Sequence, residues 1–93
     1  MNAVVQVQHN IRPMRDVDVP AVLGVEQSCY EFPWSAGNFI DSIHAGYRCW
    51  VYETAGEIIG HAVMMTALDE AHLLNIAISP NWQRQGLGAA FLL

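Results

Sequence analysis

The sequence predicts one α/β domain with a mixed sheet, in which a strand and two helices are followed by a three-stranded meander and a further helix. In one early segment, apolar residues recur at helical spacing, and cap residues mark a second, shorter helix after it. Three later runs, rich in aromatic and β-branched residues, are separated by short polar turns, as in antiparallel strands. With 93 residues and 53% hydrophobic content, the chain can form one compact core but not two.

The first predicted strand lies in VVQVQHNIRPM, where polar and apolar residues roughly alternate. Pro13 marks its far end or an edge of the sheet, because proline cannot donate a ladder hydrogen bond. A helix is predicted in VDVPAVLGVEQSCY, with Asp16 as its N-cap and Pro20 in its first turn. The apolar face of this helix repeats at helical spacing at Val22, Val25 and Cys29.

The segment EFPWS ends this helix, because Pro33 disfavours helical backbone at Phe32. Ser35 is placed to cap a second, shorter helix in AGNFIDSIHA. Gly46 follows at the C′ position, where a residue in the left-handed conformation commonly ends a helix. The first half is therefore predicted as strand, helix, helix.

Three strands are predicted in the second half, in the segments YRCWVYE, IIGHAVMMTAL and AHLLNIAIS. The residues TAGE have turn chemistry, so the first two strands are expected to form a hairpin. Asp69 and Glu70 are expected to make the next turn. After Pro80 and a glycine-rich loop, a helix is predicted to begin near Leu87.

Charge and composition narrow the classes of partner. Nine acidic residues and four arginines give a net charge of -5, unlike the basic surface of a general nucleic-acid binder. No apolar run approaches the ~20 residues of a membrane span. The N-terminus lacks the pattern of a secretory signal, which favours the cytoplasm and reduced side chains at Cys29 and Cys49. The cysteines and histidines show no ligand spacing, so no metal is expected.

The segment NWQRQGLGAAF places two glycines one residue apart in front of an apolar helix. Gly86 and Gly88 lack a Cβ, so an anion such as phosphate can approach the backbone N–H groups where the helix begins. Arg84 adds a positive charge at the same place. A dinucleotide fingerprint would need a third glycine where Phe91 stands, and a P-loop would need a lysine after its last glycine. An ordinary glycine turn is the alternative explanation.

The segment LLNIAISPNWQRQGLGAAFL resembles the acetyl-CoA-binding segment of the GNAT N-acetyltransferase superfamily, whose signature Q/R-x-x-G-x-G/A is met by Gln83, Gly86 and Gly88. In addition, FPWS, LDEAHLLNIAI and QRQGLG occur in this order. They resemble the bacterial branch that acetylates the N-terminal alanine of a small-subunit ribosomal protein. The similarity starts at IRPMRDVDVPAVLGVE and implies that residues 1–93 are the N-terminal portion of a GNAT domain, ending before its later strands.

The resemblance also implies how acetyl-CoA is bound. Ile76, Ala77 and Ile78 would offer backbone groups to the pantetheine arm, as if it were an added strand. Their side chains are equally consistent with a core strand. The residues implied to surround the pyrophosphate are Arg84, Gln85, Gly86, Leu87, Gly88 and Ala89.

For the acceptor peptide, the resemblance implies that Pro33 and Trp34 border the substrate, although Trp34 is equally explained as a core anchor. Glu70 is a candidate substrate-site residue and substitute base, because other GNAT branches take a carboxylate from this strand. An acid in a turn is more often simply solvated. The glutamate and tyrosine that transfer protons in this branch correspond to positions after residue 93, so no catalytic residue is assigned.

Together these features predict an acetyl-CoA-dependent acyltransferase whose acceptor is the basic N-terminal peptide of a ribosomal protein. We expect the 93-residue chain by itself to be inactive. The alternative is a half-domain that binds CoA, or only assembles with another chain, without catalysis. The strand edge at Ile76 and Ile78 is expected to lack a neighbouring strand, which favours self-association.

Overall fold

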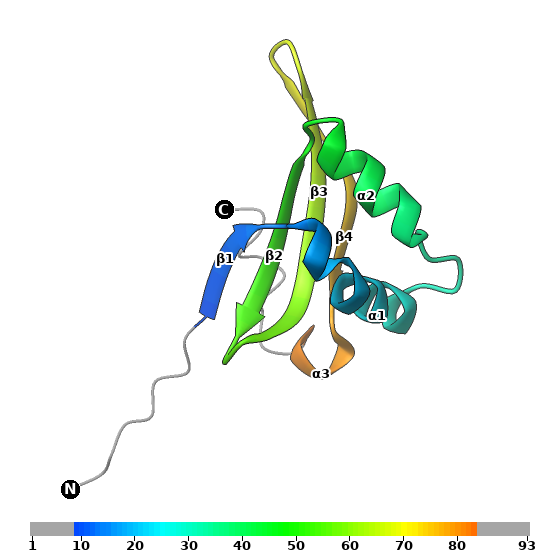
Figure 1. The fold of residues 1–93 in the computed structure, drawn as a ribbon, viewed down its shortest axis with the longest axis vertical. Coiled ribbons are helices and arrows are strands. Elements are labelled where there is room, and N and C mark those ends of the chain that lie inside the picture. The colour runs from blue at the N-terminus through cyan, green and yellow to red at the C-terminus, as the bar shows by residue number, and fades with distance from the viewer. Residues whose placement is uncertain (1–8, 84–93) are drawn as a thin grey trace, which may run out of the picture.

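The computed structural model describes residues 9–83, which form an antiparallel sheet with two helices packed on one face (Figure 1). From the first strand to the fourth, the strands and the two long helices follow the order predicted from the sequence, whereas two short helical turns were not predicted. They are β1 (His9–Pro13), the 3-10 turn η1 (Asp16–Asp18), α1 (Val19–Cys29), α2 (Ala36–His44), β2 (Arg48–Thr54), β3 (Glu57–Ala67), β4 (Glu70–Ile78) and α3 (Pro80–Gln83).

The four strands lie in the order β1, β2, β3, β4, and each pairs antiparallel with its neighbour. The predicted three-stranded meander is therefore confirmed, and β1 adds a fourth strand beside β2. Pro13 is the last residue of β1 and lies opposite Trp50. This edge position tolerates proline, since an edge strand has one side without ladder hydrogen bonds.

The two long helices begin differently, and one predicted cap is wrong. Ser35 caps α2 as expected, because its hydroxyl oxygen accepts a hydrogen bond from the backbone N–H of Asn38 at 3.2 Å. Asp16 does not cap α1, because the chain enters that helix through η1. This turn places Asp18 where its carboxylate accepts from the N–H of Arg15 at 2.8 Å.

Positive backbone angles mark the turns between elements. Gly46, with φ of +82°, follows α2 as predicted. Ala55 and Gly56 both have positive φ and connect β2 to β3. The prediction that Asp69 and Glu70 form the next turn is wrong by one residue, because Glu70 already pairs with Ala67. The turn residues are therefore 68 and 69.

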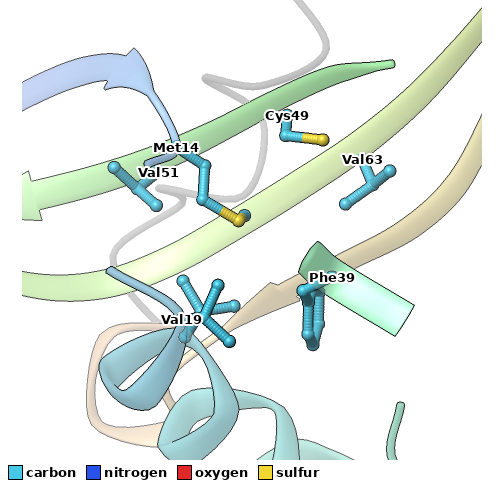
Figure 2. Close-up of a cluster of buried hydrophobic side chains, with 7 residues drawn as sticks. Met14, Val19, Phe39, Cys49, Val51 and Val63 are labelled. Carbon is cyan, nitrogen blue, oxygen red and sulfur yellow. The ribbon is translucent and has the colours of Figure 1, made fainter. Parts of the chain in front are cut away.

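The core lies between the helices and the sheet, and most of its members are drawn in Figure 2. Phe39 of α2 is fully buried and faces the sheet. Cys29 and Cys49 are free thiols, and burial raises the pKa of Cys49. The buried residues of this cluster are Met14, Val19, Val22, Phe39, Cys49, Val51 and Val63.

The strand β4 contains a bulge, and the residues around it line a cavity. Val63 pairs with Asn75, but the next residue of β3, Met64, pairs with Leu73. Leu74 is therefore an extra residue on β4, which bends the strand locally. On its other side, β4 has no strand partner within residues 9–83.

The end of the described chain differs from the expected glycine-rich loop. A short helix, α3, already begins at Pro80. The helix predicted near Leu87 lies outside the described residues. Within residues 9–83, the longest helices are too short and too polar to cross a membrane.

Candidate functional site

A cavity of about 340 Å³ lies between the end of α1, the loop that follows it and the bulged part of β4. Its mouth is apolar, since Phe32 is 87% exposed and Leu73 and Leu74 are about half exposed. The lining residues are Glu26, Tyr30, Phe32, Trp34, Leu73, Leu74, Asn75 and Ile76. Apolar walls around a few polar groups are typical of small-ligand and peptide-end sites.

The polar group of this cavity is the carboxylate of Glu26, which is only 1% exposed. Its Oε2 accepts hydrogen bonds from the backbone N–H of Trp34 at 2.9 Å and from Nδ2 of Asn75 at 2.8 Å. Its Oε1 lies 2.9 Å from Nε2 of His61. Glu26 therefore connects α1 to the following loop, to β3 and to β4. We call Glu26, His61, Asn75 and Trp34 the Glu26 cluster.

His61 is fully buried within this cluster. Burial lowers the pKa of His61, while the hydrogen bond and the charge of Glu26 oppose that shift. The ring is therefore neutral near pH 7, and its Nε2–H donates to Glu26. Nδ1 of His61 and Oδ1 of Asn75 are buried acceptors without a hydrogen-bond partner in the described part of the chain. Phe39 packs edge-on against the imidazole, with ring centroids 5.2 Å apart.

The outer edge of β4 runs along one side of the cavity. The N–H of Ser79 donates to the carbonyl of Ile59 at 2.7 Å, so Ser79 faces β3. In an antiparallel ladder, alternate residues direct both backbone groups to the same side. Ala77 therefore also faces β3, whereas Ile76 and Ile78 direct their N–H and C=O groups to the outer edge.

Side chains from the end of α1, from the residue that follows it and from α3 contact the carbonyls on this edge. The Tyr30 hydroxyl donates to the carbonyl of Ile76. Sγ of Cys29 and Nε2 of Gln83 lie 3.1 and 2.9 Å from the carbonyl oxygen of Ile78. The N–H groups of the two isoleucines point to the same edge, where they can donate to a ligand.

Some of the residues proposed from the sequence lie together and others do not. Ile76 and Trp34 both line the cavity. Pro33 is exposed beside Trp34, whose ring also packs on Phe39 at a centroid distance of 5.2 Å, so Trp34 both lines the cavity and packs against the core. Glu70 is exposed at the far end of the β3–β4 hairpin, hydrogen-bonded to His72 at 3.0 Å, and is not among the cavity-lining residues.

The remaining proposed residues, 84 to 89, lie outside the described part of the chain. Within the described part, no group of three or more histidine, cysteine, aspartate or glutamate residues could hold a metal ion.

Sequence reasoning missed the Glu26 cluster. The signal was present in α1, where Val19, Val22 and Glu26 fall on one helix face at spacings of three and four. A carboxylate at an apolar-face position indicates a buried partner, because an unpaired buried charge is too costly. His61 within the apolar run of β3 was the matching signal.

The chain matches one known domain family and its curated members. Residues 45–93 match the acetyltransferase (GNAT) domain. The [ribosomal protein bS18]-alanine N-acetyltransferase of Escherichia coli K12 is 37% identical over 84 residues, which are 90% of this chain and 57% of that protein. The putative enzyme of the same name from Bacillus subtilis is 32% identical over 82 residues, which cover 84% of this chain and 53% of that protein.

Solved structures agree with these sequence matches. The crystal structure of the E. coli ribosomal-protein-S18-alanine N-acetyltransferase superposes with a TM-score of 0.84 at 36% identity, covering 91% of this chain and 55% of that one. The PaiA N-acetyltransferase of Thermoplasma acidophilum, solved with coenzyme A, has the same fold at 13% identity, with a TM-score of 0.82 over 91% of this chain and 67% of that one. The chain spans little more than half the length of the curated relatives it matches.

Proposed function

The chain belongs to the GNAT acetyltransferase family, and from this premise we propose that it forms the acetyl-CoA-binding part of a protein N-terminal acetyltransferase. The proposed acceptor is the N-terminal alanine of a small-subunit ribosomal protein, which places the enzyme in the cytoplasm. The observation that carries the proposal is the 37% identity to the E. coli bS18-alanine N-acetyltransferase over 90% of this chain.

The outer edge of β4 fits the pantetheine arm of acetyl-CoA. Ile76 and Ile78 direct N–H groups to this edge, so they can donate to the amide carbonyls of an extended ligand lying along the strand. Ala77 would contribute its small side chain but not its backbone groups, which face β3. Arg84 to Ala89 are proposed to hold the pyrophosphate through backbone N–H groups and the arginine charge.

The cavity beside this edge is proposed to receive the first residue of the acceptor peptide. It adjoins Ile76, so a peptide end in it lies next to a ligand bound along β4. Phe32, Leu73 and Leu74 supply apolar contacts at its mouth. The net charge of -5 favours a basic peptide, because opposite charges increase the rate of encounter.

The reaction requires attack of the neutral α-amine on the thioester carbonyl. A C–N bond forms, the C–S bond breaks, the amine loses a proton and the departing thiolate gains one. Residues 9–83 bind and orient the two substrates in this scheme, and we assign no proton-transfer group among them.

The proposal is tested with the protein purified at its natural length, which we call the natural full chain. It is incubated with acetyl-CoA and a basic peptide that begins with alanine. We expect release of free thiol and acetylation of the peptide amine. Mass spectrometry measures the acetylation. The matched control is the same peptide with a blocked amino terminus. CoA binding without turnover supports the half-domain alternative, and absence of both binding and turnover contradicts the family assignment of function.

A further inference from the structure

We propose that Glu26 is a positioning residue, whose carboxylate holds Trp34 and Asn75 where they shape the acceptor side of the cavity. The expected effect of Glu26 on acetyl transfer rests on the proposed function. Its role in fixing the loop at Trp34 and the strand at Asn75 does not. No direct contact between Glu26 and the reacting amine is required.

Burial of the Glu26 carboxylate is costly. A carboxylate that is 1% exposed loses its hydration, and apolar residues of similar volume often replace buried ionic groups without loss of stability. Glu26 instead accepts from three donors that belong to three separate segments. Such a group contributes a defined geometry, because each donor is left unpaired if its segment moves.

The loop between α1 and α2 depends on Glu26 for its position. Phe32 and Pro33 are exposed there, so few apolar contacts hold the backbone. The hydrogen bond from the Trp34 N–H to Glu26 spans eight residues and fixes the loop just before the cap of α2. The position of the cavity wall therefore depends on this bond.

Glu26 also holds the residue that follows the bulge of β4. Asn75 follows the extra residue Leu74 and precedes Ile76, whose N–H faces the outer edge of β4. The bond from Nδ2 of Asn75 to Glu26 holds Asn75 on the helix-covered face. A slip of one residue would reverse the faces of all the following side chains, so this bond helps to set which backbone groups reach the edge.

A direct role for Glu26 as a base predicts a different mutational pattern, and Glu26→Gln separates the two. The amide oxygen of glutamine can accept from both Trp34 and Asn75. Its amide nitrogen can donate to Nε2 of His61 once the imidazole proton moves to Nδ1. The substitution thus keeps the hydrogen bonds and removes the charge and the basicity.

The experiment compares the natural full chain with its Glu26→Gln and Glu26→Ala variants, and Glu57→Ala serves as the matched control at an exposed site. Amide exchange at Trp34 reports whether the loop is held, and kcat/KM for the alanine peptide reports the acceptor site. We expect Glu26→Ala to lose the protection and to lower kcat/KM about 10- to 100-fold, as loss of a hydrogen bond to a charged group does. Glu26→Gln should keep the protection, stay within about threefold of wild type in kcat/KM, and retain the pH profile.

Turnover that follows the protection of Trp34 across the variants supports the proposal. The proposal is overturned if Glu26→Gln keeps the exchange protection of the Trp34 amide but loses turnover and the ascending limb of the pH profile. A general base at Glu26 would give that result. The proposal is also overturned if the Trp34 amide is equally protected with and without the Glu26 side chain. If the wild-type chain does not acetylate the peptide, the proposed function fails, and exchange at Trp34 in Glu26→Gln and Glu26→Ala still decides the positioning role.

Discussion

Asp18 and Glu26 are both buried carboxylates, but they are held in different ways. Asp18, 5% exposed, accepts a two-pronged pair of hydrogen bonds from the Arg12 guanidinium at 2.7 and 2.9 Å. Glu26 is more deeply buried, and it accepts from a neutral imidazole, an amide and a backbone N–H. One carboxylate is neutralised by a cation, and the other is solvated by dipoles.

The two arrangements serve different parts of the molecule. The Arg12 guanidinium holds the pKa of Asp18 well below its usual range and ties β1 to the entrance of α1. The Glu26 cluster instead lies at the cavity and joins the segments that form its walls. The comparison indicates that an ion pair stabilises the fold near the sheet edge, whereas a cluster of dipoles organises the candidate site.

The largest expected effect comes from Glu26→Ala. It removes the acceptor of three buried donors, and we expect the free energy of unfolding to fall by about 4 kcal/mol. Urea denaturation of the natural full chain measures this. If Glu26→Ala lowers the free energy of unfolding no more than Asp18→Ala does, the Glu26 cluster does not stabilise the fold more than the Asp18–Arg12 ion pair.

Asp18→Ala is expected to cost less, about 2 kcal/mol. Arg12 keeps a second partner, because its Nη2 also lies 3.2 Å from Glu53, and its side chain is 22% exposed to water. Asp16→Ala is the matched control, since Asp16 is exposed and pairs with the exposed His44. That control should lie within about 1 kcal/mol of wild type, the range of surface ion pairs.

The pH dependence should separate the two carboxylates. Because burial lowers the pKa of His61, the unfolded chain takes up a proton below about pH 6.5 that the folded chain does not. The free energy of unfolding should therefore fall as the pH drops below 6.5, by up to ~1.4 kcal/mol per pH unit. His61→Gln should remove this dependence and His72→Gln, at an exposed position, should not.

The contribution of Asp18 should disappear in a lower pH window. Its pKa is lowered in the folded state, so its stabilisation is present above the unfolded value near ~3.9 and is lost as the pH falls below it. Asp18→Asn should flatten the stability curve only below about pH 4. Equal flattening near pH 6 in this variant would contradict the separation of the two clusters.

The smallest effect is expected for Glu70→Gln. Glu70 is exposed and contacts His72, away from the cavity lining, so neither stability nor acetyl transfer should change. A change below about 0.5 kcal/mol in unfolding and about twofold in kcat/KM is expected for such a surface site. A loss of turnover above tenfold would restore Glu70 as a candidate base.

Local sequence was sufficient where a residue acts on its immediate neighbours. The cap at Ser35 and the left-handed Gly46 were predicted because both depend on backbone groups within a few residues. The same reasoning failed at Asp16, because a 3-10 turn precedes α1 and the carboxylate held at this turn is that of Asp18, which accepts from Arg12 six residues earlier. It also misplaced the β3–β4 turn, where pairing of Ala67 with Glu70 puts the exposed Leu68 in a left-handed conformation.

The order of strands and helices and the hairpins were predicted from periodicity and turn residues, because each of these depends on contacts close in the chain. The family was recognised from the resemblance of short motifs. The Glu26 cluster was decided only by the tertiary structure. Glu26 lies 35 residues from His61 and 49 from Asn75, and the bulge at Leu74 sets which side chains of β4 face α1. Strand register and helix packing are settled by the whole core, so no single segment contains the information that brings these groups together.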